Sequence, residues 1–247
     1  MSIVKEKIYT IPVNDAFAAE SPCPLCTLQQ GLEDQLLEYY LGPSLMESDV
    51  RQVTNKTGFC GDHIAKLYTS QKNRLGMGLM LHTHLQHVTG DLEKIVPRSA
   101  KGKRRGLFDR SEGSALSKAA DHIRSRAESC IICERMTETM ARYIEVIMWQ
   151  FMNESDFKTK FNNSQGFCLM HLADLLDGAD RHLRGGDQES FVTQLWNLEH
   201  GKLEELIGDV EWFTLKFDYR NTDKPWGNSK DALPQAIRRL TGDRPLS

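Results

Sequence analysis

Eight cysteine and histidine residues, arranged in the same order twice, constrain this chain of 247 residues more than any other feature. Each copy has Cys-x-x-Cys followed by Gly-Phe-Cys-x-x-His: Cys23, Cys26, Cys60 and His63 in the first copy, and Cys130, Cys133, Cys168 and His171 in the second. The segment between the second and third cysteine has 33 residues in the first copy (27–59) and 34 in the second (134–167). This nearly constant spacing predicts an internal duplication and therefore two similar halves.

The two copies have the residue types of metal sites. Structural zinc sites are closed by four tetrahedral ligands drawn from thiolate sulfur and imidazole nitrogen, and the two copies use all six cysteines of the chain. A Cys-x-x-His at a helix start places both side chains one turn apart, and the free N–H groups and the helix dipole there favour a thiolate. We predict one Cys3His metal site in each half, with all four ligands coming from that half.

The identity of the metal stays open between zinc and an iron–sulfur cluster, because both accept thiolates together with a histidine. The long segments between ligand pairs favour zinc, since one ion can then hold helices together. A thioredoxin-like dithiol would need a βαβ pattern, which the sequence does not show. A covalent c-type haem would need histidine directly after the second cysteine, where Thr27 and Glu134 stand.

Composition excludes several classes of protein. A formal net charge of −3 and a pI near 6.3 predict no general attraction to nucleic acid. No window approaches the 18 apolar residues of a membrane span, and residues 1–14 lack the apolar region of an export signal. We therefore expect a cytoplasmic protein, in which Cys-x-x-Cys pairs are more often metal ligands than disulfides.

Apolar residues at helical spacing predict an all-α fold. Helices are expected over 26–40, in short return segments within 44–57 and 153–165, and in long segments over 63–96 and 171–218, the last broken at Gly185-Gly186. A final helix is expected between Asp231 as N-cap and Gly242 as its stop. The alternating stretch 3–11 favours a short extended arm instead.

These segments predict two pseudo-symmetric helical halves from an internal duplication, each held by its own Cys3His site. The predicted division has four parts: a first repeat over 1–96, a basic linker over 97–113, a second repeat over 114–211 and a C-terminal strap over 212–247. The linker combines Pro, Gly, Lys and Arg, a composition typical of a solvated, flexible connection.

Two weaker groups of residues could carry function. His82, His84 and His87 follow one another on an expected helix, but His82 points about 200° away from His84 at helical spacing, which disfavours a three-histidine metal site. In the strap, an irregular segment combines charged and aromatic residues, which makes Asp218, Tyr219, Arg220 and Trp226 weak candidates for binding a small ligand. The alternative interpretation is that the aromatic residues of the strap cover the core.

The chain resembles a family of bacterial and archaeal proteins of unknown function. The resemblance rests on Cys-Pro-Leu-Cys, on the repeated Gly-Phe-Cys-x-x-His, and on the tail that runs from Glu211-Trp-Phe-Thr-Leu-Lys-Phe-Asp-Tyr-Arg220 to Pro225-Trp226-Gly227. It covers nearly the whole chain and implies no activity. Members of this family come largely from anaerobes, which makes an iron–sulfur cluster a stronger alternative. Some members carry a transporter substrate-binding label, which does not fit this chain because we expect no export signal in it.

The sequence therefore predicts a cytoplasmic metal-binding helical protein, with structural zinc in both sites and a surface that serves a protein partner or a small ligand. Two alternatives remain: an iron–sulfur redox or cluster-handling protein, and an enzyme with a site between the halves near the C-terminal tail. Neither nucleic acid nor a membrane is expected as a partner.

Overall fold

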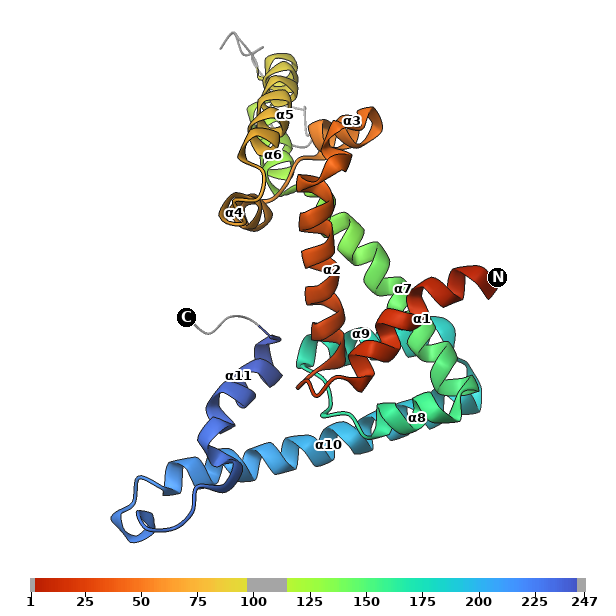
Figure 1. The fold of residues 1–247 in the computed structure, drawn as a ribbon, viewed down its shortest axis with the longest axis vertical. Helices are drawn as coiled ribbons and strands as arrows, with labels where there is room; N and C mark the ends of the chain where they lie inside the picture. The colour runs from red at the N-terminus through yellow and green to blue at the C-terminus, as the bar shows by residue number, and fades with distance from the viewer. Residues whose placement is uncertain (1–2, 97–114, 244–247) are drawn as a thin grey trace, which may run out of the picture. The chain divides into compact units, whose positions relative to one another are not determined.

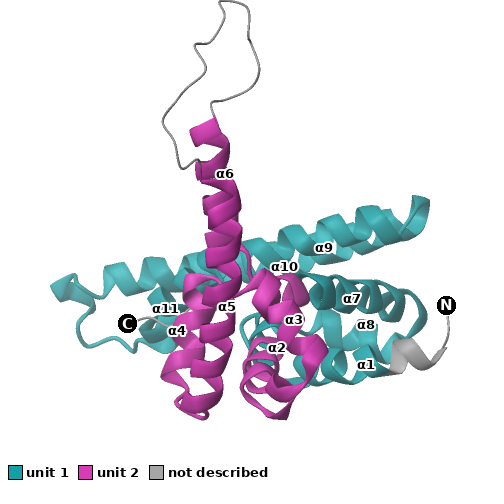
Figure 2. Cartoon of the chain, turned by 90° about the horizontal axis from the view of Figure 1, so that it is seen from above, with its two compact units in different colours: residues 1–31, 137–247 teal, residues 32–136 magenta. Residues whose placement is uncertain are grey.

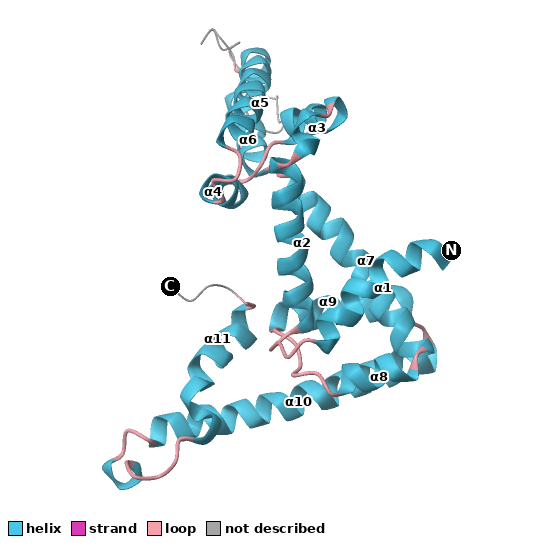
Figure 3. Cartoon of the chain, viewed as in Figure 1, coloured by secondary structure: helices cyan, strands magenta, loops and turns pink. Residues whose placement is uncertain are grey.

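A computed structural model describes residues 3–96 and 115–243 of the chain (Figure 1). Over these residues the structure is helical and contains no strand, which confirms the all-α prediction (Figure 3). The α-helices are α1 (Ile3–Ala18), α2 (Pro24–Leu41), α3 (Ser48–Thr57), α4 (Gly61–Thr69), α5 (Arg74–Ile95), α6 (Ala115–Glu128), α7 (Ile131–Asn153), α8 (Ser155–Asn162), α9 (Leu169–His182), α10 (Gly185–Leu215) and α11 (Ala232–Thr241). Short 3-10 helices lie at Pro43–Met46 (η1), Tyr219–Asn221 (η2) and Gly227–Asp231 (η3).

The chain divides into two compact units (Figure 2). Unit 1 comprises residues 1–31 and 137–247, and unit 2 comprises residues 32–136. Both boundaries fall inside helices, so α2 and α7 each contribute to both units. The four-part division expected from the sequence remains a prediction, and its basic linker, 97–113, lies outside the described residues.

Phenylalanine side chains form the centre of unit 1. Six of them contact one another with ring centroids 4.9–6.2 Å apart: Phe17, Phe151, Phe157, Phe161, Phe167 and Phe191. Five of the six are at most 1% exposed, so this cluster buries a large apolar area. Because Phe167 directly precedes Cys168, the cluster also fixes the position of that cysteine.

Unit 2 has a mixed aliphatic and aromatic core. Phe59 packs edge-on against Tyr40 at the C-terminal end of α2, with ring centroids 5.7 Å apart. Leu67 from α4 and Ile132 from α7 are buried in the same core cluster. Phe59 precedes Cys60 as Phe167 precedes Cys168, so in both units a buried phenylalanine anchors the cysteine that follows it.

Two local expectations are wrong. The stretch 3–11 is the first part of helix α1, because Val13, Ala16 and Phe17 form a buried face at helical spacing further along the same helix. The segment 63–96 is two helices rather than one, because the chain turns between Thr69 and Arg74. In that turn Gln71 has a positive φ of 51°, and Asn73 caps α5 by accepting a hydrogen bond from the Gly76 N–H at 2.8 Å.

None of the described helices is both long enough and apolar enough to cross a membrane.

Candidate metal centres

The eight predicted ligands lie in two groups, but the groups are crossed with respect to the sequence repeats. Site A consists of Cys23, Cys26, Cys168 and His171, and site B of Cys60, His63, Cys130 and Cys133. In each site the four ligand atoms lie within 4.8 Å of one another, so either site could hold a metal ion. The expectation that each half supplies all four ligands of its own site is therefore wrong: each site combines the Cys-x-x-Cys of one copy with the Cys-x-x-His of the other.

Helix lengths explain the crossing. In the first copy, α2 continues for 15 residues beyond Cys26, about 22 Å, whereas the ten residues of α3 extend only about 15 Å. In the second copy, α7 continues for 20 residues beyond Cys133, about 30 Å, whereas the eight residues of α8 extend only about 12 Å. The return helices are thus too short to bring the chain back to its own Cys-x-x-Cys.

Each Gly-Phe-Cys-x-x-His motif folds into a turn followed by a helix start. Gly58 and Gly166 have positive φ angles of 74° and 88°, a conformation that favours glycine. The cysteine that follows is the N-cap of α4 or α9, and the histidine is the third residue of that helix. This confirms the expectation that the cysteine and histidine face the same way across one turn at a helix start.

In site A, the His171 Nδ1 atom faces all three sulfur atoms. It lies 3.5 Å from the Cys23 Sγ, 3.3 Å from the Cys26 Sγ and 3.2 Å from the Cys168 Sγ. The Cys26 and Cys168 sulfurs are 3.7 Å apart. The four atoms therefore converge on one point, as the ligands of a single ion do.

Site B repeats this geometry. The His63 Nδ1 atom lies 3.2 Å from the sulfurs of Cys60 and Cys130 and 3.4 Å from that of Cys133, and the Cys60 and Cys133 sulfurs are 3.9 Å apart. A backbone hydrogen bond connects the two motifs that form site B. The Ile131 N–H, beside Cys130, donates to the carbonyl of Gly58, which precedes Cys60, at 3.0 Å. The Ser129 hydroxyl adds a hydrogen bond of 2.6 Å to the Thr57 carbonyl.

The second nitrogen of each ligand histidine has its own partner on α2. The Nε2–H of His63 donates to the Glu33 carboxylate at 3.0 Å, and Lys66 Nζ lies 2.6 Å from both oxygens of that carboxylate. The Nε2–H of His171 donates to the Gln29 side-chain oxygen at 2.9 Å. A proton held on Nε2 leaves Nδ1 free to bind a metal, which is the usual arrangement for ligand histidines.

The two sites differ in exposure. In site A, Cys23, Cys168 and His171 are at most 5% exposed, and Cys26 is half-buried. The end of α11 lies against this site: a Cβ atom placed on Gly242 would be 3.9 Å from the Cys168 Sγ and 4.0 Å from the Cys26 Sγ. In site B, Cys130 and His63 are buried, Cys60 is half-buried and Cys133 is exposed.

A buried ion pair holds the turn before Cys168. Glu199 on α10 is fully buried, accepts a hydrogen bond from the Phe167 N–H at 2.8 Å and lies 3.3 Å from Arg239 of α11. Arg239 also donates to the carbonyls of Phe167 and Gln165. Burial raises the pKa of Glu199, and the charge of Arg239 opposes that rise. The strap therefore contributes to the shape of site A through α11.

Each site holds one cysteine that ionises readily. Burial opposes the ionisation of Cys130, but the contact with the His63 imidazole and the hydrogen bond from the Cys133 N–H lower its pKa to about 6. Hydrogen bonds from Cys23 and Cys26 hold the pKa of Cys168 far below its usual value. Neighbouring thiols that share protons in this way are a suitable environment for a cation, which replaces those protons when it binds.

The three candidate histidines of α5 belong to neither site. His84 donates from Nδ1 to the Asn55 carbonyl at 2.9 Å, and its ring fills the space beside Gly58, where a Cβ atom would lie only 2.4 Å from the ring. His87 Nε2 lies 3.5 Å from the Asp91 carboxylate. His84 therefore has a packing role beside the turn that leads to Cys60.

The strap residues Asp218, Tyr219, Arg220 and Trp226 belong to neither metal group, and their role in binding a small ligand stays a prediction. Asp218 pairs with Arg220, whose Nε lies 3.0 Å from its carboxylate, and this pairing lowers the pKa of Asp218. Tyr219 is 86% exposed.

The strap loop is organised around the buried Lys216. Its ammonium donates to the carbonyls of Asn221, Thr222 and Lys224 at 2.6–2.9 Å. The same ammonium lies 5.1 Å from the centre of the Trp226 ring. Lys216 was not singled out from the sequence, because lysines are usually exposed.

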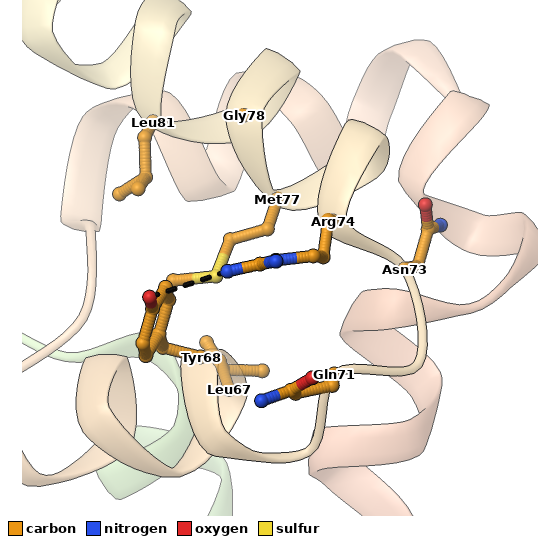
Figure 4. Close-up of a pocket in the computed structure, with 8 residues that line it drawn as sticks. All are labelled: Leu67, Tyr68, Gln71, Asn73, Arg74, Met77, Gly78 and Leu81. Atoms are coloured by element: carbon orange, nitrogen blue, oxygen red, sulfur yellow. Dashed lines mark hydrogen bonds between the residues drawn. The ribbon is translucent and has the colours of Figure 1, made fainter.

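A small pocket lies between α4 and α5 (Figure 4). Leu67, Met77 and Leu81 line it with apolar atoms, and the Arg74 guanidinium at its edge donates to the Tyr68 hydroxyl at 3.3 Å. Its volume of about 160 Å³ is smaller than the roughly 300–1,000 Å³ of typical ligand sites. We therefore do not assign it a ligand.

Sequence reasoning missed the residues that support the ligands. They are Gln29, Glu33, Lys66, Glu199 and Arg239. The available signal was the position of Glu33 directly after Leu32 on the buried side of α2, where an unpaired carboxylate would be costly. No spacing rule connects Arg239 to Glu199, which precedes it by 40 residues.

The chain belongs to a family of unknown function, DUF6062, whose model matches residues 4–247. This confirms the resemblance to an uncharacterised family over nearly the whole chain. No curated protein and no solved structure matches the chain.

Proposed function

For a chain whose family has no assigned activity, we propose that sites A and B each bind one structural zinc ion, in a cytoplasmic protein whose surface serves a protein partner or a small ligand. The observation that carries the proposal is the spacing of the ligand atoms. Zn–S bonds of about 2.3 Å in a tetrahedron place two sulfurs about 3.8 Å apart. The distances between the Cys26 and Cys168 sulfurs in site A, 3.7 Å, and between the Cys60 and Cys133 sulfurs in site B, 3.9 Å, agree with that value.

The same spacing disfavours the iron–sulfur alternative. In a cluster the protein ligands bind different iron atoms and stand apart from one another. Here all four ligand atoms of each site lie within 4.8 Å, and each histidine nitrogen is within 3.5 Å of every sulfur in its site. This arrangement supports a single ion in each site.

The sites are suited to a structural rather than a catalytic ion. Each provides four protein ligands, which leaves no open position for substrate or water. Each ion would connect helix starts that lie far apart in the sequence, and its binding free energy would stabilise the fold.

The test is elemental analysis of protein purified without oxygen, together with an absorption spectrum. We expect two zinc ions per chain, no labile sulfide and no visible colour. A brown protein that contains iron and sulfide would contradict the proposal and favour the redox or cluster-handling alternative. Removal of zinc with a strong chelator is expected to reduce the helical circular dichroism signal, and restored zinc is expected to recover it.

A further inference from the structure

The two sites have the same ligand types but different access to solvent. In site A the three cysteines are buried or half-buried, and the α11 C-cap Gly242 lies beside the sulfurs of Cys26 and Cys168. In site B, Cys133 is exposed and Cys60 is half-buried. Reactions of a thiolate with a soluble oxidant require access to its sulfur.

We propose that site B is an oxidant-sensitive zinc switch, whereas site A keeps its ion under the same conditions. The proposal rests on the zinc function proposed above and adds a regulatory role to one of the two sites. The reacting pair is Cys133 and Cys60, because these are the two accessible cysteines of site B and their sulfurs are only 3.9 Å apart. Cys130, the third sulfur of the site, is 2% exposed.

The reaction requires a two-electron oxidant, and hydrogen peroxide is the oxidant proposed for it. The Cys133 thiolate attacks one peroxide oxygen, the O–O bond breaks, and the products are a sulfenic acid and a hydroxide ion. The Cys60 thiolate then attacks the sulfenic sulfur, an S–S bond forms and hydroxide leaves. In total, two thiolates lose two electrons, and hydrogen peroxide with two protons becomes two water molecules.

The disulfide removes two of the four ligands from site B. Cys130 and His63 alone do not complete a structural zinc site, so the ion is released. Release of the zinc ion breaks the metal-mediated link between the start of α4 and the start of α7. The hydrogen bond from the Ile131 N–H to the Gly58 carbonyl remains, so we expect local loosening of α4 rather than unfolding of the unit.

The experiment treats the zinc-loaded full-length protein with hydrogen peroxide and follows released zinc with a colorimetric chelator. We expect loss of one of the two zinc ions while the second stays bound. Differential alkylation and peptide mass spectrometry should then locate the disulfide between Cys60 and Cys133. Reduction with a thiol, followed by addition of zinc, should restore the second bound zinc ion per chain.

Two matched variants assign the released ion. In Cys133→Ser, which disables site B, we expect one bound zinc that resists peroxide. In Cys26→Ser, which alters the corresponding position of site A, we expect one bound zinc that peroxide releases. If either variant fails to fold, the mapping of oxidised cysteines in the wild-type protein still decides the question.

Three outcomes would overturn the proposal: release of both ions together, release from site A first, or a disulfide among Cys23, Cys26 and Cys168. These outcomes can be distinguished from failure of the proposed zinc function. If the purified protein contains no zinc before peroxide is added, the zinc function is contradicted, whereas the three outcomes above contradict the difference between the sites.

Discussion

Individual side chains beside the two Cys3His groups orient their histidines. Glu33 accepts a hydrogen bond from His63 and contacts Lys66, whereas the corresponding acceptor for His171 is the neutral Gln29. Partners of this kind orient the imidazole and increase its basicity. The two histidines are therefore supported by groups of different charge.

Replacement of Glu33 tests this support. We expect Glu33→Ala to weaken zinc binding at site B by about 10- to 100-fold, because the His63 imidazole loses its acceptor. Glu33→Gln is the matched control, since it retains an acceptor of the type that Gln29 provides, and should weaken binding less. Competition with a chelator of known affinity measures both variants. Equal affinity in the wild-type protein and Glu33→Ala would show that the carboxylate does not support the ligand.

Gly166 is a second residue with a specific prediction. A Cβ atom at this position would lie 2.6 Å from the Arg239 Nη1 and 2.8 Å from the Glu199 Oε2, and φ is 88°. We expect Gly166→Ala to destabilise the fold by about 1–3 kcal/mol, measured by denaturant unfolding at constant zinc. The control is Gly186→Ala, where a Cβ atom meets nothing within 4 Å on helix α10; it should be neutral or stabilise by up to about 1 kcal/mol.

At the scale of elements, α11 is connected to site A through a buried charge pair. Arg239→Ala would leave the carboxylate of Glu199, which is fully buried, without its cation. We expect a loss of about 3–5 kcal/mol in unfolding free energy. The double variant Arg239→Ala, Glu199→Gln should lose less than the single variant, because the uncompensated charge is gone. Urea unfolding of both variants measures the difference, and a double variant that is less stable than Arg239→Ala would contradict this account.

Secondary structure was largely predictable from the sequence, because leucine spacing, Gly42-Pro43, Asp231 and Gly242 are local signals. Helix α2 and helix α11 follow these predictions closely. The helix at 3–18 was missed because its buried residues, Val13, Ala16 and Phe17, follow the alternating stretch rather than lie in it. The turn at 70–73 was missed because it contains neither glycine nor proline.

The residues of the two Cys3His groups were also predictable, but the way they combine into groups was not. Residue type and spacing point to the same eight residues that the structure brings together. Grouping depends on whether α3 and α8 bring the chain back to its own Cys-x-x-Cys, and this depends on their lengths of 10 and 8 residues. The ends of helices are only weakly encoded in local sequence, so the crossed arrangement is evident only from the fold.

At the scale of the whole chain, each crossed site combines residues of the first sequence copy with residues of the second. Site A joins ligands near residue 25 to ligands near residue 170, and site B joins residues 60 and 63 to residues 130 and 133. Any cut between residues 64 and 129 therefore leaves both sites with ligands on both fragments. If each half instead held its own site, the same cut would leave one complete site on each fragment.

A split-chain experiment separates these arrangements. A protease site is introduced within 97–113, and the cut protein is analysed by size-exclusion chromatography. We expect the fragments to elute together while zinc is bound and to separate, or aggregate, after chelation. Fragments that separate while each keeps one zinc ion would contradict the crossed sites. An uncut sample with the same insertion is the control.

The crossed grouping also has a consequence for synthesis on the ribosome. Cys168 is made 142 residues after Cys26, which at about 5–20 residues per second corresponds to roughly 7–30 s of translation. During that interval Cys60 and His63 emerge, while the residues that complete site A do not yet exist. A growing chain that met zinc early would offer it the first-copy set of three cysteines and one histidine. Under the proposed zinc function, an ion bound in this way would have to be exchanged before site A could form.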